Sequence, residues 1–300
     1  MIKQIDMKKH LKYLLILLLF VPIINSCSPD DSNSDDINTV PLEESILLNV
    51  SYGTNSQQVY DIYLPANRTS EKTKVIALVH GGGWTSGDKS DMDDFIDLIK
   101  FNHPDHAIVN INYILAVPFS IPAFPNQFID LESAISQLTN LKDEYQILPE
   151  FGLIGTSAGA HLSLMYDYLY DSNDQVKMVC DIVGPTDFTD PFYADDPLFE
   201  ILVGALIDES AYPPQSNYAE ITSPLFHVSG FSSPTILFYG SDDPLVPITN
   251  GNNLDMALTN NSVTHSYTTY QGGHGGWSDE SLNNLTEQLI SFINTHLPIN

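Results

Sequence analysis

Hydrophobic residues gather in short runs from about residue 45 onward, and these runs predict strands. Continuous apolar runs lie at 75–79, 107–111, 152–154, 179–183, 234–239 and 264–270. Such runs are typical of strands that are buried on both faces of a parallel sheet. The segments 46–50 and 59–64 alternate with a period of two residues instead, which predicts an antiparallel pair at one edge of the sheet.

Helical patterns lie between these predicted strands. Apolar residues recur at helical spacing in 91–101, 126–141, 158–170 and 280–296. Strands that alternate with helices, without an internal repeat, predict one doubly wound α/β domain over 45–300. Residues 188–232 interrupt the alternation after the sixth strand and include a possible short helix at 198–206. We expect them to form a small cap-like insertion over the carboxyl edge of the sheet, where open α/β folds bind ligands.

The first 26 residues have the pattern of an export signal. Lysines at positions 8, 9 and 12 precede an apolar stretch at 14–21, which is too short to span a bilayer comfortably. Cys27 follows directly and resembles the lipidated cysteine of a bacterial lipobox, although Asn25 is untypical at its position. We therefore predict a lipoprotein signal peptide at 1–26 and lipidation of Cys27. An ordinary cleaved signal or an uncleaved anchor remains the alternative.

Residues 27–44 are predicted to be a polar, acidic tether. The stretch 28–36 reads SPDDSNSDD and has no apolar residue to bury. An acidic run directly after the cysteine resembles the signal that directs bacterial lipoproteins to the cell surface. The sequence therefore predicts an exported bacterial lipoprotein, held in the outer membrane or at the cell surface by its lipid anchor.

Charge and cysteine content narrow the possible partners. The 300 residues include 38 Asp and Glu against 11 Lys and Arg, a formal net charge of −27. Such a chain repels phosphate backbones, so we expect no nucleic-acid partner. The only cysteines are Cys27 and Cys180, and no cysteine–histidine cluster is present. We therefore expect neither a metal nor a cofactor, and we interpret the acidic groups at 88–94 and 195–196 as a solvated face.

Residues 155–159 read Gly-Thr-Ser-Ala-Gly and match the pattern G-x-S-x-G. The match follows an apolar strand and opens a predicted helix, which is the setting of a nucleophile elbow. Ser157 would project its hydroxyl at the helix N-terminus, where developing negative charge is favoured. A second tract, His80-Gly81-Gly82-Gly83-Trp84, also follows a strand. Its glycine N–H groups can point at an oxyanion, whereas His80 is expected to order the loop.

A serine nucleophile needs a base, and the base needs an acid that orients it. Of the nine histidines, His274 alone lies between glycine pairs in a loop directly after a predicted strand. We therefore predict His274 as the base. Asp243, in the loop after 234–239, is the predicted acid because it completes the chain order Ser, Asp, His. Asp242 and Asp187 are the rival acids, and Asp187 is expected to cap the start of the insertion.

Together these blocks, with Gly184-Pro185-Thr186-Asp187 and 223–228, resemble the α/β-hydrolase superfamily over about residues 56–296. The sequence is most similar to carboxylesterases related to hormone-sensitive lipase and to the BD-FAE feruloyl and acetyl esterases. The resemblance implies a Ser157–His274–Asp243 triad, and an oxyanion hole from the N–H groups of Gly82, Gly83 and Ala158. Relatives commonly have Tyr-Arg-Leu after the fourth strand, where this chain has Tyr113-Ile114-Leu115. Substrate contacts made by that arginine therefore do not transfer.

The sequence thus predicts a serine carboxylesterase that acts on short-chain or carbohydrate-linked acyl esters. Its partners would be a small-molecule or polysaccharide ester and the membrane that holds its anchor. Trp84, Phe119, Phe188 and Trp277 are predicted to line the substrate site because they lie near the motifs. Two alternatives are a serine peptidase of the prolyl-oligopeptidase type and a surface lipoprotein that binds glycans on an inactivated hydrolase scaffold.

Overall fold

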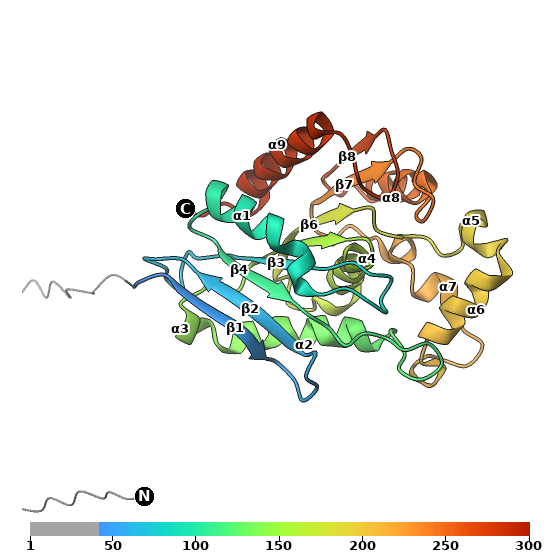
Figure 1. Ribbon diagram of the computed structural model, residues 1–300, viewed down its shortest axis with the longest axis horizontal. Helices are drawn as coiled ribbons and strands as arrows, with labels where there is room; N and C mark the ends of the chain where they lie inside the picture. Colours follow the sequence, from blue (N-terminus) through green and yellow to red (C-terminus); the bar gives the residue numbers. More distant parts are fainter. Residues whose placement is uncertain (1–41) are drawn as a thin grey trace, which may run out of the picture. The chain divides into compact units, whose positions relative to one another are not determined.

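The computed structural model describes residues 42–300, which form an eight-stranded sheet (Figure 1). Its strands run in the order β1–β2–β4–β3–β5–β6–β7–β8. Their bounds are β1 (Ser45–Ser51), β2 (Val59–Leu64), β3 (Val75–Val79), β4 (Ala107–Ile111), β5 (Phe151–Thr156), β6 (Val176–Ile182), β7 (Thr235–Gly240) and β8 (His265–Tyr270). β2 pairs antiparallel with β1 and β4, and every other pairing is parallel. The predicted fold class, a mostly parallel sheet with an antiparallel N-terminal edge, is confirmed.

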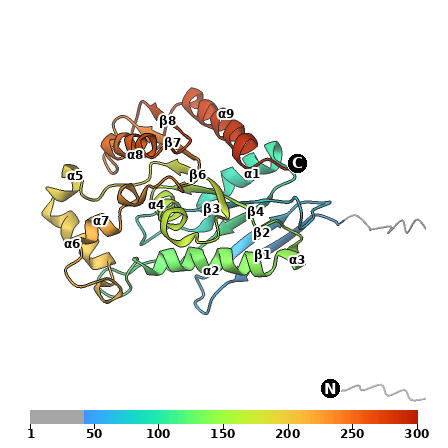
Figure 2. The same cartoon turned by 180° about the vertical axis from the view of Figure 1, so that it is seen from behind.

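Helices cover both faces of the sheet, as the two opposite views show (Figures 1 and 2). One face carries α1 (Asp93–Asn102), which follows the short helix η1 (Lys89–Met92), and α9 (Asp279–His296). The other carries α2 (Asn126–Asn140), α3 (Lys142–Tyr145), α4 (Ala158–Met165) with its π-helical extension η2 (Tyr166–Tyr170), and α8 (Ile248–Asn260). Both faces are therefore covered by helices, as a doubly wound domain requires.

The core has one layer on each side of the sheet. In β3, Val75, Ala77 and Val79 belong to the layer that also holds residues of α2, α4 and α8, whereas Ile76 and Leu78 belong to the layer on the other face, with residues of α1 and α9. All five β3 side chains are fully buried. Because successive side chains point to opposite faces, a central strand must be apolar at every position. Each buried valine, isoleucine or leucine side chain contributes about 1.5–3 kcal/mol by its burial.

The strands β8 and β2 correct two sequence-based expectations about burial. β8 is an edge strand, and its first five residues are exposed or half-buried, although its pattern predicted burial on both faces. β2 shows no alternation of burial, because it lies between β1 and β4 and is almost wholly buried. Threonine and tyrosine suit either environment, so their pattern alone does not distinguish an edge strand from a central one.

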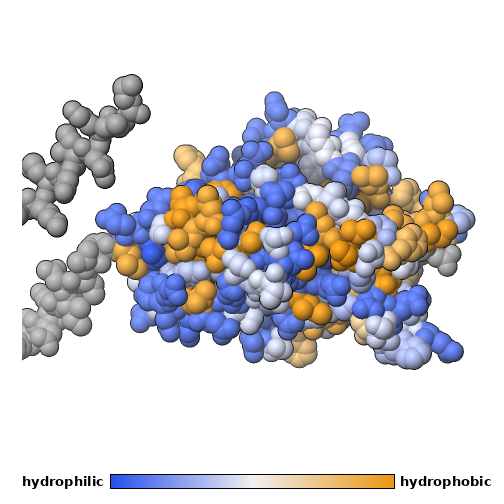
Figure 3. Space-filling model, turned by 60° about the horizontal axis from the view of Figure 1, so that its bottom comes forward, coloured by the Kyte–Doolittle hydropathy of each residue, from blue (hydrophilic) through white to orange (hydrophobic). Residues whose placement is uncertain are grey.

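The predicted insertion lies between β6 and β7 and forms a small cap. It contains α5 (Pro191–Ala194), α6 (Pro197–Leu206), η3 (Glu209–Ala211), α7 (Tyr218–Ile221) and η4 (Pro224–His227). Asp190 and Asp196 cap α5 and α6, each of which begins with proline. α6 exposes Leu198, Ile201 and Leu202. Figure 3 shows hydrophobic areas at the end of the molecule where Figure 1 draws α5 and α6.

Candidate active site

Ser157 lies on a strained turn between β5 and α4. Its backbone angles are φ 51° and ψ −119°, a region that residues with a Cβ rarely occupy. A Cβ on Gly155 would lie 2.4 Å from the carbonyl oxygen of Gly159, and one on Gly159 would lie 2.1 Å from that of Val79. The two glycines are therefore required by the close approach of β3, β5 and α4 around the serine.

The structure brings Ser157, His274 and Asp243 together in one chain of hydrogen bonds. His274 Nε2 lies 2.9 Å from Ser157 Oγ, and His274 Nδ1 lies 2.7 Å from Asp243 Oδ2. The three residues follow β5, β8 and β7, whose carboxyl ends share one edge of the sheet. Because the carboxylate accepts the Nδ1–H, the lone pair on Nε2 is left for the serine hydroxyl.

Asp243 is held in its ionised form. Burial alone would raise its pKa, but hydrogen bonds from His274 and from the N–H groups of Leu245 and Val246 lower the pKa below its ordinary value. The two N–H groups lie 2.8 and 3.0 Å from Asp243 Oδ1. A carboxylate bonded on both oxygens keeps its charge and fixes the orientation of the imidazole.

The two rival acids bond elsewhere. Asp242 accepts the hydroxyl of Ser241 at 2.8 Å. Asp187 accepts the N–H of Thr189 at 2.9 Å and the side-chain amide of Asn253 at 3.3 Å. Asp187 therefore closes a local turn at the start of the insertion, whereas the first helix of the insertion is capped by Asp190 and not by Asp187 as the sequence predicted.

The loop after β3 packs against Ser157. A Cβ on Gly81 would lie 3.2 Å from Ser157 Cβ, and Gly82 and Gly83 have φ angles of 116° and 57°. Within residues 42–300, the N–H groups of Gly82, Gly83 and Ala158 donate no hydrogen bond to another residue. Ala158 is also the first residue of α4, whose dipole favours an anion there. These N–H groups can therefore receive an oxyanion formed at Ser157.

Buried side chains fix the shape of this loop. The His80 ring stacks on Tyr113 at 4.3 Å, and the Tyr113 hydroxyl donates to the His80 carbonyl at 2.9 Å. Burial lowers the pKa of His80, so its neutral Nδ1–H donates to the Gly81 carbonyl. The Gln127 amide donates to the Trp84 and Ile114 carbonyls, both at 2.8 Å. The sequence predicted the structural role of His80, but no sequence signal marked Gln127.

The four predicted aromatic residues do not form one wall. Trp84 is buried, its indole N–H donates to His161 Nδ1 at 3.2 Å, and its ring packs on Phe188 at 5.7 Å. Trp277 lies in the His274 loop instead, where its indole N–H donates to the Gly273 carbonyl at 3.0 Å. Phe119 is 80 % exposed. Trp84 and Phe188 therefore belong to one aromatic cluster, while Trp277 supports the histidine loop.

Two cavities are lined by residues of this region, one by His274 and the other by Phe188 of the aromatic cluster. The first, here called the His274 recess, measures about 340 Å³ and lies between α1 and α9. It is lined by Phe95, Leu98, Ile182, His274, Trp277 and Leu285, among others. The second, here called the cap cavity, measures about 550 Å³, and its lining includes Phe188, Tyr193, Phe199, Val203, Ile207 and Tyr218. Both cavities have a largely apolar lining, which suits uncharged substrate groups.

At the position after β4 where relatives commonly have arginine, Ile114 contacts a buried acid, Asp130. The N–H of Ile114, at the arginine's position, donates to Asp130 Oδ2 at 2.8 Å. Asp130 Oδ1 accepts the side-chain amide of Gln58, also at 2.8 Å. Burial raises the pKa of Asp130 in spite of these bonds. Polar neutral groups therefore hold this carboxyl, and the fold is kept.

The fold and the strand–serine–helix turn define an α/β-hydrolase. The sequence profile of the BD-FAE family matches residues 60–258, so the chain belongs to this family. The predicted resemblance is confirmed.

Individual relatives are more distant. Bovine (Bos taurus) arylacetamide deacetylase is 26 % identical over 157 residues, which are 49 % of this chain and 39 % of that relative. A truncated carbohydrate esterase from gut microbiota has a TM-score of 0.67 at 20 % identity, covering 84 % of this chain and 96 % of its own. An acetyl ester-xyloside bifunctional hydrolase from Caldicellulosiruptor lactoaceticus has a TM-score of 0.66 at 19 % identity, covering 88 % and 100 %. At these identities, the solved structures show the shared fold.

The predictions for the N-terminal region lie almost wholly outside the described residues. These are the signal peptide at 1–26, lipidation of Cys27 and most of the tether at 27–44. Within residues 42–300, no helix has the length and apolar character that crossing a bilayer demands.

Proposed function

We propose that the protein is a serine carboxylesterase that forms an acyl-enzyme on Ser157. The observation that carries this proposal is the Ser157–His274–Asp243 chain of hydrogen bonds, beside N–H groups that have no partner among residues 42–300. A hydroxyl with a base at 2.9 Å, and donors ready for a tetrahedral oxyanion, suits acyl transfer. Membership of the BD-FAE family supports ester chemistry.

In the first half of the reaction, His274 Nε2 takes the proton of Ser157 as Oγ attacks the ester carbonyl. The carbonyl oxygen becomes an oxyanion, which Gly82, Gly83 and Ala158 stabilise through their N–H groups. Asp243 stabilises the imidazolium that forms. His274 then returns the proton to the alcohol oxygen, and the alcohol leaves.

In the second half, water replaces the alcohol. His274 takes a proton from the water as its oxygen attacks the acyl carbonyl, and the oxyanion occupies the same N–H groups. When the tetrahedral intermediate collapses, the bond to Ser157 breaks and His274 protonates Oγ. The products are the carboxylic acid and the enzyme in its starting form.

For the substrate, we propose short-chain or carbohydrate-linked acyl esters. Solved structures that share this fold include a carbohydrate esterase and an acetyl ester-xyloside hydrolase, which supports an acylated carbohydrate. The formal net charge of −27 disfavours polyanionic substrates and is compatible with neutral, decorated polysaccharides.

A fluorophosphonate probe tests the mechanism, because it labels an activated serine whatever the substrate. We expect wild-type protein to be labelled on Ser157 and the Ser157→Ala variant to remain unlabelled. Hydrolysis of p-nitrophenyl esters, acetylated xylan and feruloylated xylan then identifies the acyl group. If the wild type remained unlabelled but still bound xylan, the protein would be a glycan-binding protein and not an esterase.

We also propose that the protein is exported and anchored by lipid on Cys27. The positive n-region, the apolar stretch at 14–21 and the cysteine that follows support this proposal. Metabolic labelling with palmitate should mark the wild type, and the Cys27→Ser variant should lose the label and need no detergent for extraction. Palmitate label that persists in Cys27→Ser would contradict it.

A further inference from the structure

The turn after β6 lies directly against the turn that carries Ser157. The Ile182 carbonyl accepts the Ser157 N–H at 2.8 Å, and Asp181 pairs with Gly155 across the sheet. The next residue, Val183, has φ 51°, which a β-branched residue rarely adopts. Ser157 and Val183, both with strained backbone angles, thus lie beside each other. Contacts with the surrounding structure must stabilise both conformations.

Asp181 and Tyr239 hold the β6 turn by binding both backbone groups of Gly184. Asp181 Oδ1 accepts the Gly184 N–H at 2.7 Å, and the Tyr239 hydroxyl lies 2.6 Å from the Gly184 carbonyl oxygen. Both side chains are fully buried. A Cβ on Gly184 would lie 2.7 Å from Ala160 Cβ, so the turn also touches α4. Movement at Gly184 would therefore reach the helix that begins after Ser157.

The hydrogen bonds of Tyr239 require one proton more than its hydroxyl carries. That hydroxyl lies 2.7 Å from Asp181 Oδ2 as well as 2.6 Å from the Gly184 carbonyl. A tyrosine hydroxyl has one proton, and both neighbours are acceptors if Asp181 is ionised. A proton on Asp181 Oδ2 satisfies every group, because the acid then donates to the Tyr239 oxygen and Tyr239 donates to Gly184.

The surroundings favour this neutral acid. Burial raises the pKa of Asp181 to about 7. The titratable groups near it are Tyr239 on β7, Tyr168 in η2 and Tyr267 on β8, with Cys180 as its neighbour in sequence on β6. None of these residues carries a positive charge, so nothing among them compensates an ionised carboxylate.

We propose that Asp181 is a positioning residue that works in its protonated form, clamping the Gly184 turn with Tyr239 so that Ser157 keeps its strained geometry. Loss of the proton leaves the Tyr239 hydroxyl with two acceptors and one of them without a donor. The β6 turn then loosens beside Ser157. The kinetic part of this proposal rests on the proposed role of Ser157 as nucleophile, whereas the proton on Asp181 does not.

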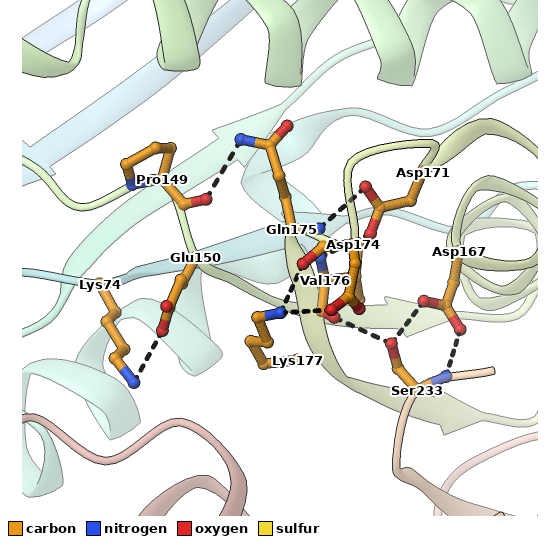
Figure 4. A network of polar contacts seen from close by, with 10 residues as sticks. All are labelled: Lys74, Pro149, Glu150, Asp167, Asp171, Asp174, Gln175, Val176, Lys177 and Ser233. Atoms are coloured by element: carbon orange, nitrogen blue, oxygen red, sulfur yellow. Dashed lines mark hydrogen bonds and ion pairs between the residues drawn. The ribbon is translucent and has the colours of Figure 1, made fainter. Parts of the chain in front are cut away.

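Asp167 offers a matched control, because it also shares a hydroxyl with a backbone carbonyl but lies away from Ser157. Figure 4 shows its carboxyl group facing Ser233. The Ser233 hydroxyl lies 2.6 Å from Asp167 Oδ1 and 2.9 Å from the Val176 carbonyl, so it too has two acceptors for one proton. Burial raises the pKa of Asp167 to about 7 as well. This clamp joins η2 to the segment before β7.

The kinetic test compares Asp181→Asn with wild type. Asparagine keeps an acceptor for Gly184 and a donor for Tyr239, but it does not ionise. The ratio of the wild-type kcat to the Asp181→Asn kcat should therefore fall as the pH rises through neutrality. We expect a fall of about fivefold, because this factor corresponds to the loss of one neutral hydrogen bond. The ratio cancels every pH effect that the two proteins share. In Asp167→Asn, the same ratio should stay constant. A constant ratio for Asp181→Asn between about pH 5 and pH 9 would overturn the proposal.

Infrared difference spectroscopy tests the proton without using activity. Wild type at about pH 5 should show buried carboxylic-acid C=O bands that titrate near neutrality, and Asp181→Asn and Asp167→Asn should each remove one of them. If Asp181→Asn does not fold, Asp167→Asn must leave a band that Tyr239→Phe shifts. A spectrum in which Asp181 is ionised at this pH would refute the proposal, whether or not the protein hydrolyses esters.

Discussion

His161 and His274 both lie in the region around Ser157, but their surroundings give the two imidazoles different roles. His274 lies in a glycine-rich loop, with Ser157 Oγ 2.9 Å from one nitrogen and Asp243 2.7 Å from the other. His161 lies on α4 and is fully buried. It accepts the Trp84 indole N–H and donates to the Thr222 carbonyl at 2.7 Å.

The difference shows that partners, not distance along the chain, decide what a histidine does. His161 follows Ser157 by one helical turn, but both of its nitrogens are occupied by fixed groups. Burial lowers the pKa of His161 to about 4, so it stays neutral and joins the loop after β3 to the cap. An acid on one side and a hydroxyl on the other make His274 the histidine that can move a proton.

The largest loss of activity is expected when the proposed base is removed. His274→Ala should lower kcat/KM for an acetyl ester by at least about a thousandfold, because Ser157 then has no proton acceptor. Its thermal midpoint should stay close to that of wild type, since the loop is partly exposed. Measurement of both quantities separates catalysis from folding. Activity near wild type would show that another group is the base.

A second large loss, no greater than that of His274→Ala, should follow Asp243→Asn. We expect roughly a thousandfold in kcat, because asparagine does not stabilise the imidazolium or fix its tautomer. Asp187→Asn is the control, since Asp187 contacts Thr189 and Asn253 instead. Steady-state kinetics of the two variants provide the comparison. If Asp187→Asn were the more damaging variant, the acid would have been assigned to the wrong strand.

His161→Phe should have the opposite effect to the two variants above, with a large loss of stability and a small loss of activity. It leaves the Trp84 N–H and the Thr222 carbonyl buried without partners, at a cost of about 1–3 kcal/mol for each group. We expect a clear drop in the free energy of unfolding and a change in kcat of less than about tenfold. His161→Gln, which can accept from one group and donate to the other, should recover part of the stability. Full stability in His161→Phe would mean that the bridge contributes little.

The same histidine should make the fold sensitive to acid. The pKa of His161 is about 4 in the folded state, against about 6.5 in an unfolded chain. Between these values the unfolded state binds more protons, so the free energy of unfolding falls as the pH drops from about 6.5 to about 4. Subtracting His161→Gln from wild type isolates this contribution. A difference that stays constant across the window would contradict the assigned pKa.

Much of this arrangement could be predicted from the sequence because its signals are local. Ser157 and the glycines beside it must be adjacent in sequence to make the turn, and His274 lies among glycines of its own. The contacts that hold them are not local. Gln127 reaches Trp84 across 43 residues, and Tyr239 reaches Asp181 across 58. Neither pairing leaves a pattern in one sequence, because only the folded sheet brings the partners together.

The misses among the elements have a similar cause. α8 was not predicted, since its stretch 248–260 holds few apolar residues and buries Asn250 and Gly251 beside Leu254 and Leu258. Asn250 is buried because its side-chain carbonyl accepts the N–H groups of Thr186 and Asp187 after β6. A polar residue that satisfies a distant loop looks like a surface residue in the sequence.

The smallest expected effect is a change in the preference for acyl chain length, which we attribute to the aromatic cluster around His161. Phe188 lies 5.2 Å from the His161 ring and 5.7 Å from Trp84, and it also lines the cap cavity. With these rings filling the space beside the loop after β3, acetyl to butyryl esters should be preferred over chains of roughly eight carbons or more. An apolar pocket discriminates by only about 1–3 kcal/mol per methylene, so the preference should be graded.

Phe188→Ala should open a path from this cluster toward the cap cavity of about 550 Å³. We therefore expect a severalfold shift of kcat/KM toward longer p-nitrophenyl esters, because the added methylenes find apolar surface to bury. Phe119→Ala is the control, since Phe119 is 80 % exposed and should leave the profile unchanged. Each series should be measured above and below micelle formation. A wild-type maximum at ten or twelve carbons that rises when micelles form would indicate a lipase, with α6 and its exposed leucines as the surface that meets the lipid.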